Sequence, residues 1–149
     1  MIKLCLFCEF VSGERKNHNN GLPLDFVNET ENTISFLSKS CPEGKKAHIL
    51  VIPKEHFSSI SELPSKLKYE LIDHVSLAIK VIKSKYDGCN ILVNDGKEAE
   101  QVIPHLHFHI VPREKNDGYK IEDWPKLKVS KDHFLKLTED IKRSFNKIK

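Results

Sequence analysis

Three histidines alternate with apolar residues in one short stretch, and this pattern constrains the fold more than any other part of the chain. The stretch reads His105-Leu-His-Phe-His-Ile-Val111. Successive side chains of a β-strand point to opposite faces, so the spacing predicts a strand with all three imidazoles on one face. Leu106, Phe108 and Ile110 would then face a hydrophobic core. Three polar rings side by side have little structural use, so we expect this face to carry chemistry.

The remaining apolar pattern predicts an α+β fold with an antiparallel sheet of about five strands. The expected strands cover residues 25–27, 33–37, 48–52, 90–94 and 105–111. Helical spacing predicts a central amphipathic helix over about 62–86 and a C-terminal helix with Ser130 as its N-cap. Strands, one helix, strands and one helix, in that order, favour an antiparallel sheet. No linker or internal repeat is visible, so we expect a single domain over residues 1–149.

Length, charge and hydropathy limit the class of protein. The chain has 149 residues, enough for one domain with a hydrophobic core. Its net charge of +3 mildly favours a phosphate-bearing ligand and is too small and scattered to indicate a nucleic-acid partner. No apolar stretch has the length of a membrane span, and Glu9 breaks the short apolar run at the start. We therefore expect no signal peptide, no membrane partner and a cytoplasmic location, where thiols stay reduced.

The residue types leave two kinds of chemistry open at the histidine stretch. One imidazole could attack phosphorus and form a covalent phospho-histidine, while its neighbours hold phosphate oxygens or donate a proton. Alternatively, two or three rings could bind a zinc ion that activates water. A second motif, Cys5-Leu-Phe-Cys8, is typical of half of a zinc site or of a redox pair. The redox alternative is less favoured, because the motif contains no Gly or Pro and follows no strand. Histidines would complete a closed structural zinc site with two cysteines and two histidines. The spacing does not choose between these chemistries.

Four segments together resemble the histidine triad (HIT) family, in its zinc-carrying branch. They are the histidine stretch, Asn94-Asp-Gly followed by Gln101, His48-Ile-Leu-Val-Ile-Pro-Lys-Glu-His56 and Cys5-Leu-Phe-Cys8. The segments stand in the family's order and span residues 5–113. This resemblance implies a nucleotide substrate bound at the histidines of a homodimer whose two sheets join into one.

The resemblance also implies a role for individual residues. His107 would be the nucleophile that attacks the α-phosphate and forms a nucleotidyl-histidine, which water then hydrolyses. His109 would contact the phosphate oxygens and help the leaving group, and His48 would join the same network. The expected substrate-binding residues are Asn94 and Gln101 beside the phosphates and Phe7, Phe10, Phe36 and Ser38 around the base and ribose. The expected ligands of a structural zinc ion are Cys5, Cys8, His56 and His105.

We therefore expect a nucleotide hydrolase or nucleotidyl transferase that acts at the α-phosphate of a purine nucleotide. The leaving group could be an amine, an acyl group or a second nucleotide. Two rival hypotheses are a hydrolase that binds a catalytic zinc ion with all three histidines, and a non-catalytic nucleotide-binding scaffold. The catalytic-zinc hypothesis would leave Cys5 and Cys8 without partners. The scaffold hypothesis does not explain why His107, His109 and Asn94 occur together, because a scaffold requires none of them.

Some positions depart from the family pattern or have no expected role. Ser38 lies near the place where the family often has an acidic residue that holds the ribose hydroxyls. Val102 replaces the hydroxyl residue that commonly follows Gln101. These differences bear on substrate preference and rate more than on reaction class. We expect Trp124 to pack over the sheet. The histidines expected to face solvent without a role are His18, His74 and His133.

Overall fold

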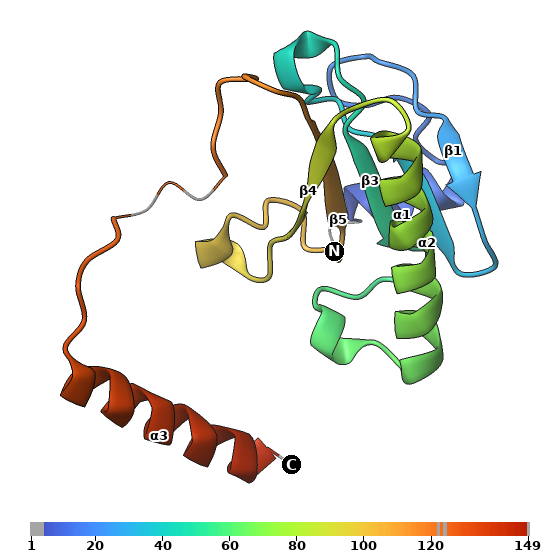
Figure 1. The fold of residues 1–149 in the computed structure, drawn as a ribbon. Coiled ribbons are helices and arrows are strands. Elements are labelled where there is room, and N and C mark those ends of the chain that lie inside the picture. Colours follow the sequence, from blue (N-terminus) through green and yellow to red (C-terminus); the bar gives the residue numbers. More distant parts are fainter. Residues whose placement is uncertain (1–4, 122, 124, 149) are drawn as a thin grey trace. The chain divides into compact units, whose positions relative to one another are not determined.

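A five-stranded antiparallel sheet, with one long helix packed on it, makes up the first of two units of the chain (Figure 1). The structure is a computed structural model that describes residues 5–121, 123 and 125–148. The first unit is Met1–Gly118 and the second is Tyr119–Lys149, and each is described by itself. The architecture confirms the predicted α+β class, with a central helix and a C-terminal helix.

The predicted strands and two long helices follow one another in the predicted order, and the structure adds one α-helix, Leu6–Ser12, that the sequence did not predict. The strands are β1 (Phe26–Glu29), β2 (Thr33–Leu37), β3 (Ile49–Pro53), β4 (Gly88–Val93) and β5 (Phe108–Arg113). The helices are α1 (Leu6–Ser12), α2 (Ser65–Lys83) and α3 (Lys131–Ile148). In space the strand order is β1-β2-β3-β5-β4, with every neighbouring pair antiparallel. Strands β1 and β4 therefore form the two edges of the sheet.

Element boundaries differ from the sequence predictions where local contacts intervene. The central helix begins at Ser65 rather than near 62, because Ser59 and Glu62 close a capping box around a separate 3₁₀ turn, Ile60–Glu62. Strand β5 begins at Phe108, so two of the three histidines lie in the bend that leads into it. Residues 105–107 nevertheless continue the alternation of side chains between the two faces of the sheet, since Leu106 packs in the same cluster as Phe108 and Ile110.

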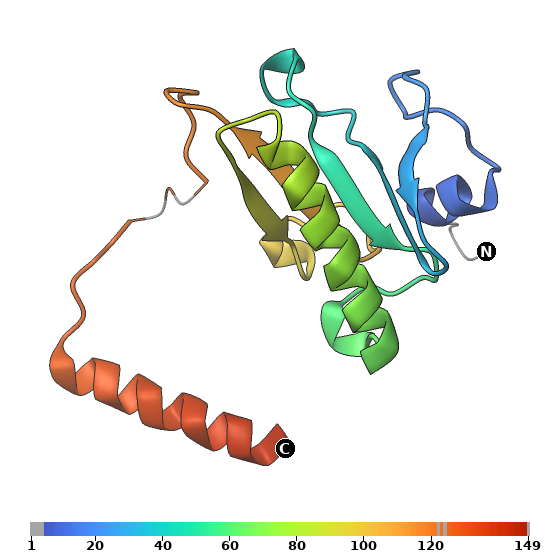
Figure 2. The ribbon, with the colours of Figure 1, turned by 45° about the vertical axis from the view of Figure 1, so that its right-hand side comes forward.

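Alternate residues of β3 separate two hydrophobic clusters on the two faces of the sheet. Ile49 and Val51 pack with α2 in the larger cluster, which also contains Leu106, Phe108 and Ile110. Leu50 and Ile52 pack with Phe7 and Phe10 of α1 and with Ile34 and Phe36 of β2. Helices α1 and α2 therefore cover opposite faces of the sheet (Figure 2). The histidine side of β5 shares its face with α1.

The expectation that His74 faces solvent is wrong. Its side chain is 3% exposed and lies on the inward side of α2, over strand β2. Its Nδ1 is 2.7 Å from Oγ1 of Thr33, and its Nε2 is 2.9 Å from Oγ of Ser35. The hydroxyls of β2 thus provide partners for both ring nitrogens, which a helical pattern read alone does not reveal.

Burial of His74 is expected to make the stability of the fold depend on pH. Desolvation lowers the pKa of this imidazole below its usual value near 6.5. In the unfolded chain this imidazole binds a proton near pH 6.5, whereas in the folded chain it stays neutral to lower pH. Its contribution to the free energy of unfolding is therefore fully present above pH 6.5 and is lost as the pH falls toward the folded-state pKa. Chemical denaturation between pH 7.5 and 5 should show a smaller loss for His74→Gln than for the wild type. Exposed His133→Gln is the matched control, and equal losses in all three proteins would contradict the prediction.

The second unit contains the amphipathic helix α3. The hydroxyl of Ser130 accepts a hydrogen bond from the backbone N–H of His133 (3.3 Å), which confirms the predicted N-cap. His133 is exposed, as expected. Trp124 lies outside the described residues. Within the part of the chain that the structure describes, no helix is both long enough and apolar enough to cross a membrane.

Candidate active site

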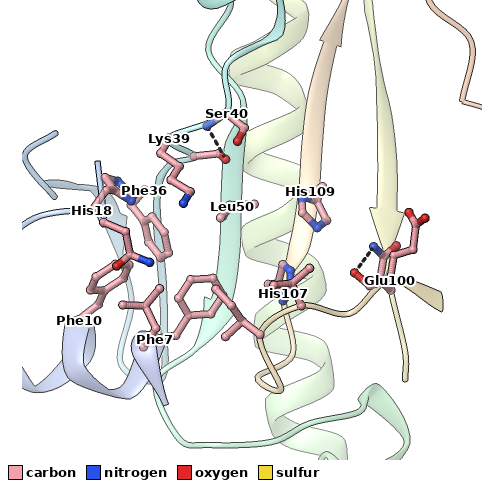
Figure 3. Close-up of a pocket in the computed structure, with 16 residues that line it drawn as sticks. Phe7, Phe10, His18, Phe36, Lys39, Ser40, Leu50, Glu100, His107 and His109 are labelled. Atoms are coloured by element: carbon pink, nitrogen blue, oxygen red, sulfur yellow. Dashed lines mark hydrogen bonds between the residues drawn. The ribbon is translucent and has the colours of Figure 1, made fainter. Parts of the chain in front are cut away.

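A cavity of about 320 Å³ lies on the α1 face of the sheet, between the aromatic side chains of the N-terminal region and the histidines of β5 (Figure 3). One wall comes from residues 6–50, and the other comes from residues 94–109. The predicted site residues that line it are Phe7, Phe10, Phe36, Ser38, Asn94, His107 and His109. The sheet order explains this convergence, because β3 lies between β2 and β5.

The N-terminal wall of the cavity is an aromatic slot made of Phe7, Phe10 and Phe36. Phe7 and Phe10 are three residues apart in α1, so they share one face of that helix. Their ring centroids are 5.8 Å apart, and those of Phe7 and Phe36 are 5.5 Å apart in an edge-to-face arrangement. All three rings are nearly completely buried. The slot offers flat apolar surfaces of the kind on which a nucleobase can stack.

The opposite wall presents a free nitrogen of His107. The Nδ1–H of this ring donates to the carbonyl oxygen of His105, 2.7 Å away. Because a carbonyl can only accept, Nδ1 carries the proton and the lone pair is on Nε2. Burial lowers the pKa of His107, so the ring is neutral at neutral pH. The ring lines the cavity and is 5.3 Å from Phe7 between centroids, so His107 lies next to the aromatic slot.

A second chain of hydrogen bonds holds His109 beside His107. The carbonyl of Ser40 accepts from Nδ1–H of His48 (2.9 Å), which leaves Nε2 of His48 to accept from Nδ1–H of His109 (3.0 Å). The ring of His109 is 4.7 Å from that of His107 between centroids. Burial, and then the nearness of His107 and His48, lower the pKa of His109 to about 4. The ligand-free site therefore holds neutral rings, and a bound phosphate would raise their pKa values.

Two polar residues expected near the phosphates have different placements. Asn94 lines the cavity, and its Nδ2 donates to the carbonyl of Glu100 (3.3 Å). Gln101 contributes no surface to the cavity. Its Nε2 donates to the carbonyl of Ser58 (2.8 Å), and its Oε1 accepts from the backbone N–H of Gly96 (2.9 Å). Gln101 thus stabilises the loop after β4 through these two contacts.

Four side chains from distant parts of the sequence meet in one group next to this wall. Cys5, Cys8, His56 and His105 each present a ligand atom, and these atoms all lie within 4.8 Å of one another. The Sγ of Cys8 is 3.3 Å from Nδ1 of His56, and the Sγ of Cys5 is 3.5 Å from Nδ1 of His105. A tetrahedral zinc ion with ordinary Zn–S and Zn–N bonds places sulfur and nitrogen ligands about 3.6 Å apart. The geometry of these two sulfur and two nitrogen ligands therefore fits a zinc ion, and the four side chains could hold one.

The surroundings of the group also suit a cation. The Nε2–H of His105 donates to the carbonyl of Pro53 (2.8 Å), which leaves Nδ1 unprotonated and directed at the cysteines. Burial lowers the pKa of His105 to about 4. Burial and the neighbouring Cys5 raise the pKa of Cys8 to about 11, because two thiolates repel each other. A bound cation would reverse this cost by favouring the thiolates.

Sequence reasoning missed His18, and the expectation that it faces solvent is wrong. It lines the aromatic end of the cavity, with its ring centroid 5.5 Å from that of Phe10. Asn19 and Lys39 line the same end. The polar segment 14–22 folds back on α1, which a loop assignment could not place. The one available signal was Asn19-Asn-Gly21, a sequence typical of a tight hairpin loop.

Comparisons with known proteins agree with this geometry. The model of the HIT domain family matches residues 20–116. A HIT-like protein of Methanocaldococcus jannaschii is 34% identical, over 89% of this chain and 97% of its own. An adenosine 5'-monophosphoramidase of Candida albicans is 30% identical, over 97% of this chain and 93% of its own. The fold and site define an α+β protein with paired buried histidines at an aromatic cavity, and the chain belongs to the HIT family.

Solved structures show the same relationship. A histidine triad nucleotide-binding protein from Candida albicans superimposes with a TM-score of 0.78 at 30% identity, covering 97% of this chain and 99% of its own. A zinc-bound histidine triad family protein from Mycobacterium smegmatis superimposes with a TM-score of 0.61 at 30% identity, covering 83% of this chain and 84% of its own. Among relatives of this chain, nucleotide-binding and zinc-binding proteins therefore both occur.

Proposed function

We propose that the protein hydrolyses or transfers a nucleotidyl group by covalent catalysis at the α-phosphate of a purine nucleotide. The observation that carries the proposal is the unprotonated Nε2 of His107, which lies next to an aromatic slot of the right kind for a base. The adenosine 5'-monophosphoramidases among its relatives support the reaction class and an adenine nucleotide.

In the proposed first step, the lone pair on Nε2 of His107 forms a bond to the α-phosphorus. The bond from phosphorus to the leaving group breaks, and the leaving group keeps that electron pair. The carbonyl of His105 stabilises the positive charge that develops on the ring, because it accepts the Nδ1–H. In the second step, water attacks phosphorus and gives a proton to the neutral His109, the bond from Nε2 of His107 to phosphorus breaks, and the lone pair returns to Nε2.

His109 and His48 act on the phosphate in this proposal. The negative charge of a bound phosphate raises the pKa of His109, so a protonated His109 can hold a phosphate oxygen or donate to the leaving group. His48 keeps the ring oriented, because its Nε2 accepts the Nδ1–H of His109. Asn94 and Ser38, which line the cavity, would contact the phosphate and the ribose. Phe7, Phe10 and Phe36 would enclose the base.

We further propose that Cys5, Cys8, His56 and His105 hold a structural zinc ion. Zinc would stabilise the four side chains as a closed site and would not contact the substrate. The thiols favour a reducing compartment such as the cytoplasm, because all four cysteines of the chain are free in the structure. The rival hypothesis of a catalytic zinc ion on all three triad histidines has less support, since Nδ1 of His105 faces the cysteines and Nδ1 of His107 donates to a carbonyl.

A substrate panel tests the proposed reaction. Adenosine and guanosine phosphoramidates, acyl nucleotides and dinucleoside polyphosphates would be assayed with zinc-loaded protein, with and without a short exposure to chelator. We expect release of a nucleoside monophosphate from at least one class, at a rate that brief chelation does not change. Immediate loss of both zinc and activity in a protein that remains folded would favour the catalytic-zinc rival. Nucleotide binding without turnover of any class would favour the scaffold.

We also propose that the protein is a homodimer joined at the edge strand β4 and the adjacent side of α2. Ile91 of β4 pairs with Ile110, so its side chain is on the α2 face, and it is 44% exposed. Ile72 of α2 is 47% exposed, and it lies on the side of the helix away from His74, which contacts β2. An unpaired edge next to exposed apolar side chains suits a two-fold interface that extends the sheet.

Light scattering at micromolar concentration is expected to give about twice the chain mass of 17.2 kDa. The Ile91→Arg variant should shift toward the mass of the single chain, because two such charges would meet across the two-fold axis. Val129→Arg, which changes a half-exposed residue outside the proposed interface, is the matched control. A wild-type protein that remains monomeric would contradict the proposed interface.

A further inference from the structure

The loop between α1 and β1 is a small hairpin that fixes the position of His18. Asn17 and Pro23 form an antiparallel bridge, and the backbone N–H of Leu24 donates to the carbonyl of Lys16 (2.9 Å). The carbonyl of His18 accepts from Gly21 (2.9 Å), and its N–H donates to Leu22 (2.8 Å). Gly21 has φ +83°, which completes a three-residue hairpin loop at a position that glycine adopts readily.

Arg15 ties this hairpin to helix α1. Its Nε donates to Oε2 of Glu9 (2.7 Å), and its NH1 donates to Oδ1 of Asn19 (3.3 Å). The second contact occupies the amide oxygen of Asn19 and leaves its N–H groups as donors. Because both the backbone and this bridge constrain the hairpin, the side chains that it brings to the cavity are held in place before any ligand binds.

The ring of His18 closes the far end of the aromatic slot (Figure 3). It is edge-to-face with Phe10 at 80°, and its centroid is 6.2 Å from that of Phe36. The backbone carbonyl of Leu37 lies near the ring and acts to raise its pKa. Burial outweighs this effect and, with a smaller contribution from the positive charge of Lys39, lowers the pKa of His18. The ring is therefore neutral at neutral pH, and one of its two nitrogens is a hydrogen-bond acceptor.

We infer that His18 is a specificity-determining residue that accepts a hydrogen bond from an N–H on the edge of the nucleobase, such as the 6-amino group of adenine. The inference rests on the proposed function, because it requires a nucleobase in the cavity, against the wall formed by Phe7, Phe10 and Phe36. A base that stacks there directs its edge toward the residue that closes the slot. An acceptor fixed at that position favours bases with a donor and disfavours a base that lacks one. The N–H groups of Asn19 provide a donor at the same end of the slot.

A pair of ligands that differ in one amino group tests the inference. Adenosine 5'-monophosphate and purine riboside 5'-monophosphate have the same phosphate and ribose, but only the first has a 6-amino group. Calorimetric titration of the full zinc-loaded chain with each ligand gives a preference that does not depend on catalysis. We expect the wild type to bind adenosine monophosphate about fivefold more tightly, the scale of one neutral hydrogen bond.

Two variants distinguish the contribution of the acceptor nitrogen of His18 from that of its aromatic ring. His18→Phe keeps an aromatic ring against Phe10 and removes the acceptor, so the preference should fall to less than about twofold while purine riboside monophosphate binds as before. His18→Ala should weaken both ligands and also show no preference. His133→Phe makes the same chemical change on exposed α3 and should keep the wild-type preference.

The outcomes distinguish this inference from the proposal on which it rests. If the wild type binds neither nucleotide, the proposed function fails, and the role of His18 fails with it. If the wild type binds both nucleotides equally, or if His18→Phe keeps the wild-type preference, the inference is overturned while the proposed function stands. Loss of the preference in His18→Phe alone, with His133→Phe unchanged, supports it.

Discussion

Replacement of His107 by alanine is expected to lower turnover about 10³-fold or more, because the covalent route loses its nucleophile. His109→Ala should cost less, about 10²-fold, which is the scale of one acid–base or oxyanion partner. Neither change should greatly weaken nucleotide binding, since the aromatic slot is made by other residues. Steady-state rates and calorimetric binding of adenosine monophosphate, measured on each variant, separate loss of chemistry from loss of the site.

The covalent nucleotidyl-histidine intermediate can be tested for directly. Rapid quench of the wild type with labelled nucleotide should trap a phosphorus–nitrogen bond on His107, and His107→Ala should trap none. His133→Ala, a change of the same type on an exposed helix, should behave as the wild type. Retention of wild-type turnover by His107→Ala would eliminate the covalent mechanism.

The second large effect concerns the cysteine–histidine group. Purified wild-type protein from a zinc-replete preparation should contain one zinc ion per chain, whereas Cys8→Ser should contain far less. Because metal binding contributes folding free energy directly, the variant should lose at least about 3 kcal/mol of stability, or about 10 °C in Tm. Elemental analysis and thermal denaturation measure these two quantities.

Cys41→Ser is the control for this experiment. Cys41 is another free cysteine, but it is not part of the group of four ligand atoms. Its replacement should leave the zinc content unchanged. Substoichiometric zinc in the wild type, or a disulfide that joins Cys5 and Cys8, would contradict the proposed metal site.

The features that the sequence predicted well are those set by short-range periodicity. Alternation at residues 105–111 correctly placed Leu106, Phe108 and Ile110 in the core and His107 and His109 on the other face, even though the strand itself begins at Phe108. The spacing of apolar residues likewise predicted both long helices. In the strands and in α2, these patterns depend on which face of the element is buried, which the chain encodes locally.

The features that the sequence did not predict depend on contacts between distant segments. His74 is buried because Thr33 and Ser35 of β2 lie under that turn of α2 and provide partners for its ring. His18 reaches the cavity because Arg15 and a glycine hairpin fold its loop onto α1. Gln101 faces Ser58 rather than the cavity because two loops meet there. The periodicity of a single segment carries no information about contacts of this kind between distant segments.

The division of the cavity between two stretches of chain separates recognition from reaction. The residues that would enclose the base precede residue 51. The residues that would act on phosphorus follow residue 93, with the exception of His48. A substitution in the hairpin can therefore change which base is accepted without displacing the reacting nitrogen. It follows that the hairpin of residues 17–23 is the exchangeable part of the site, and that grafting it from one HIT protein onto another is a route to new base preference with the chemistry retained.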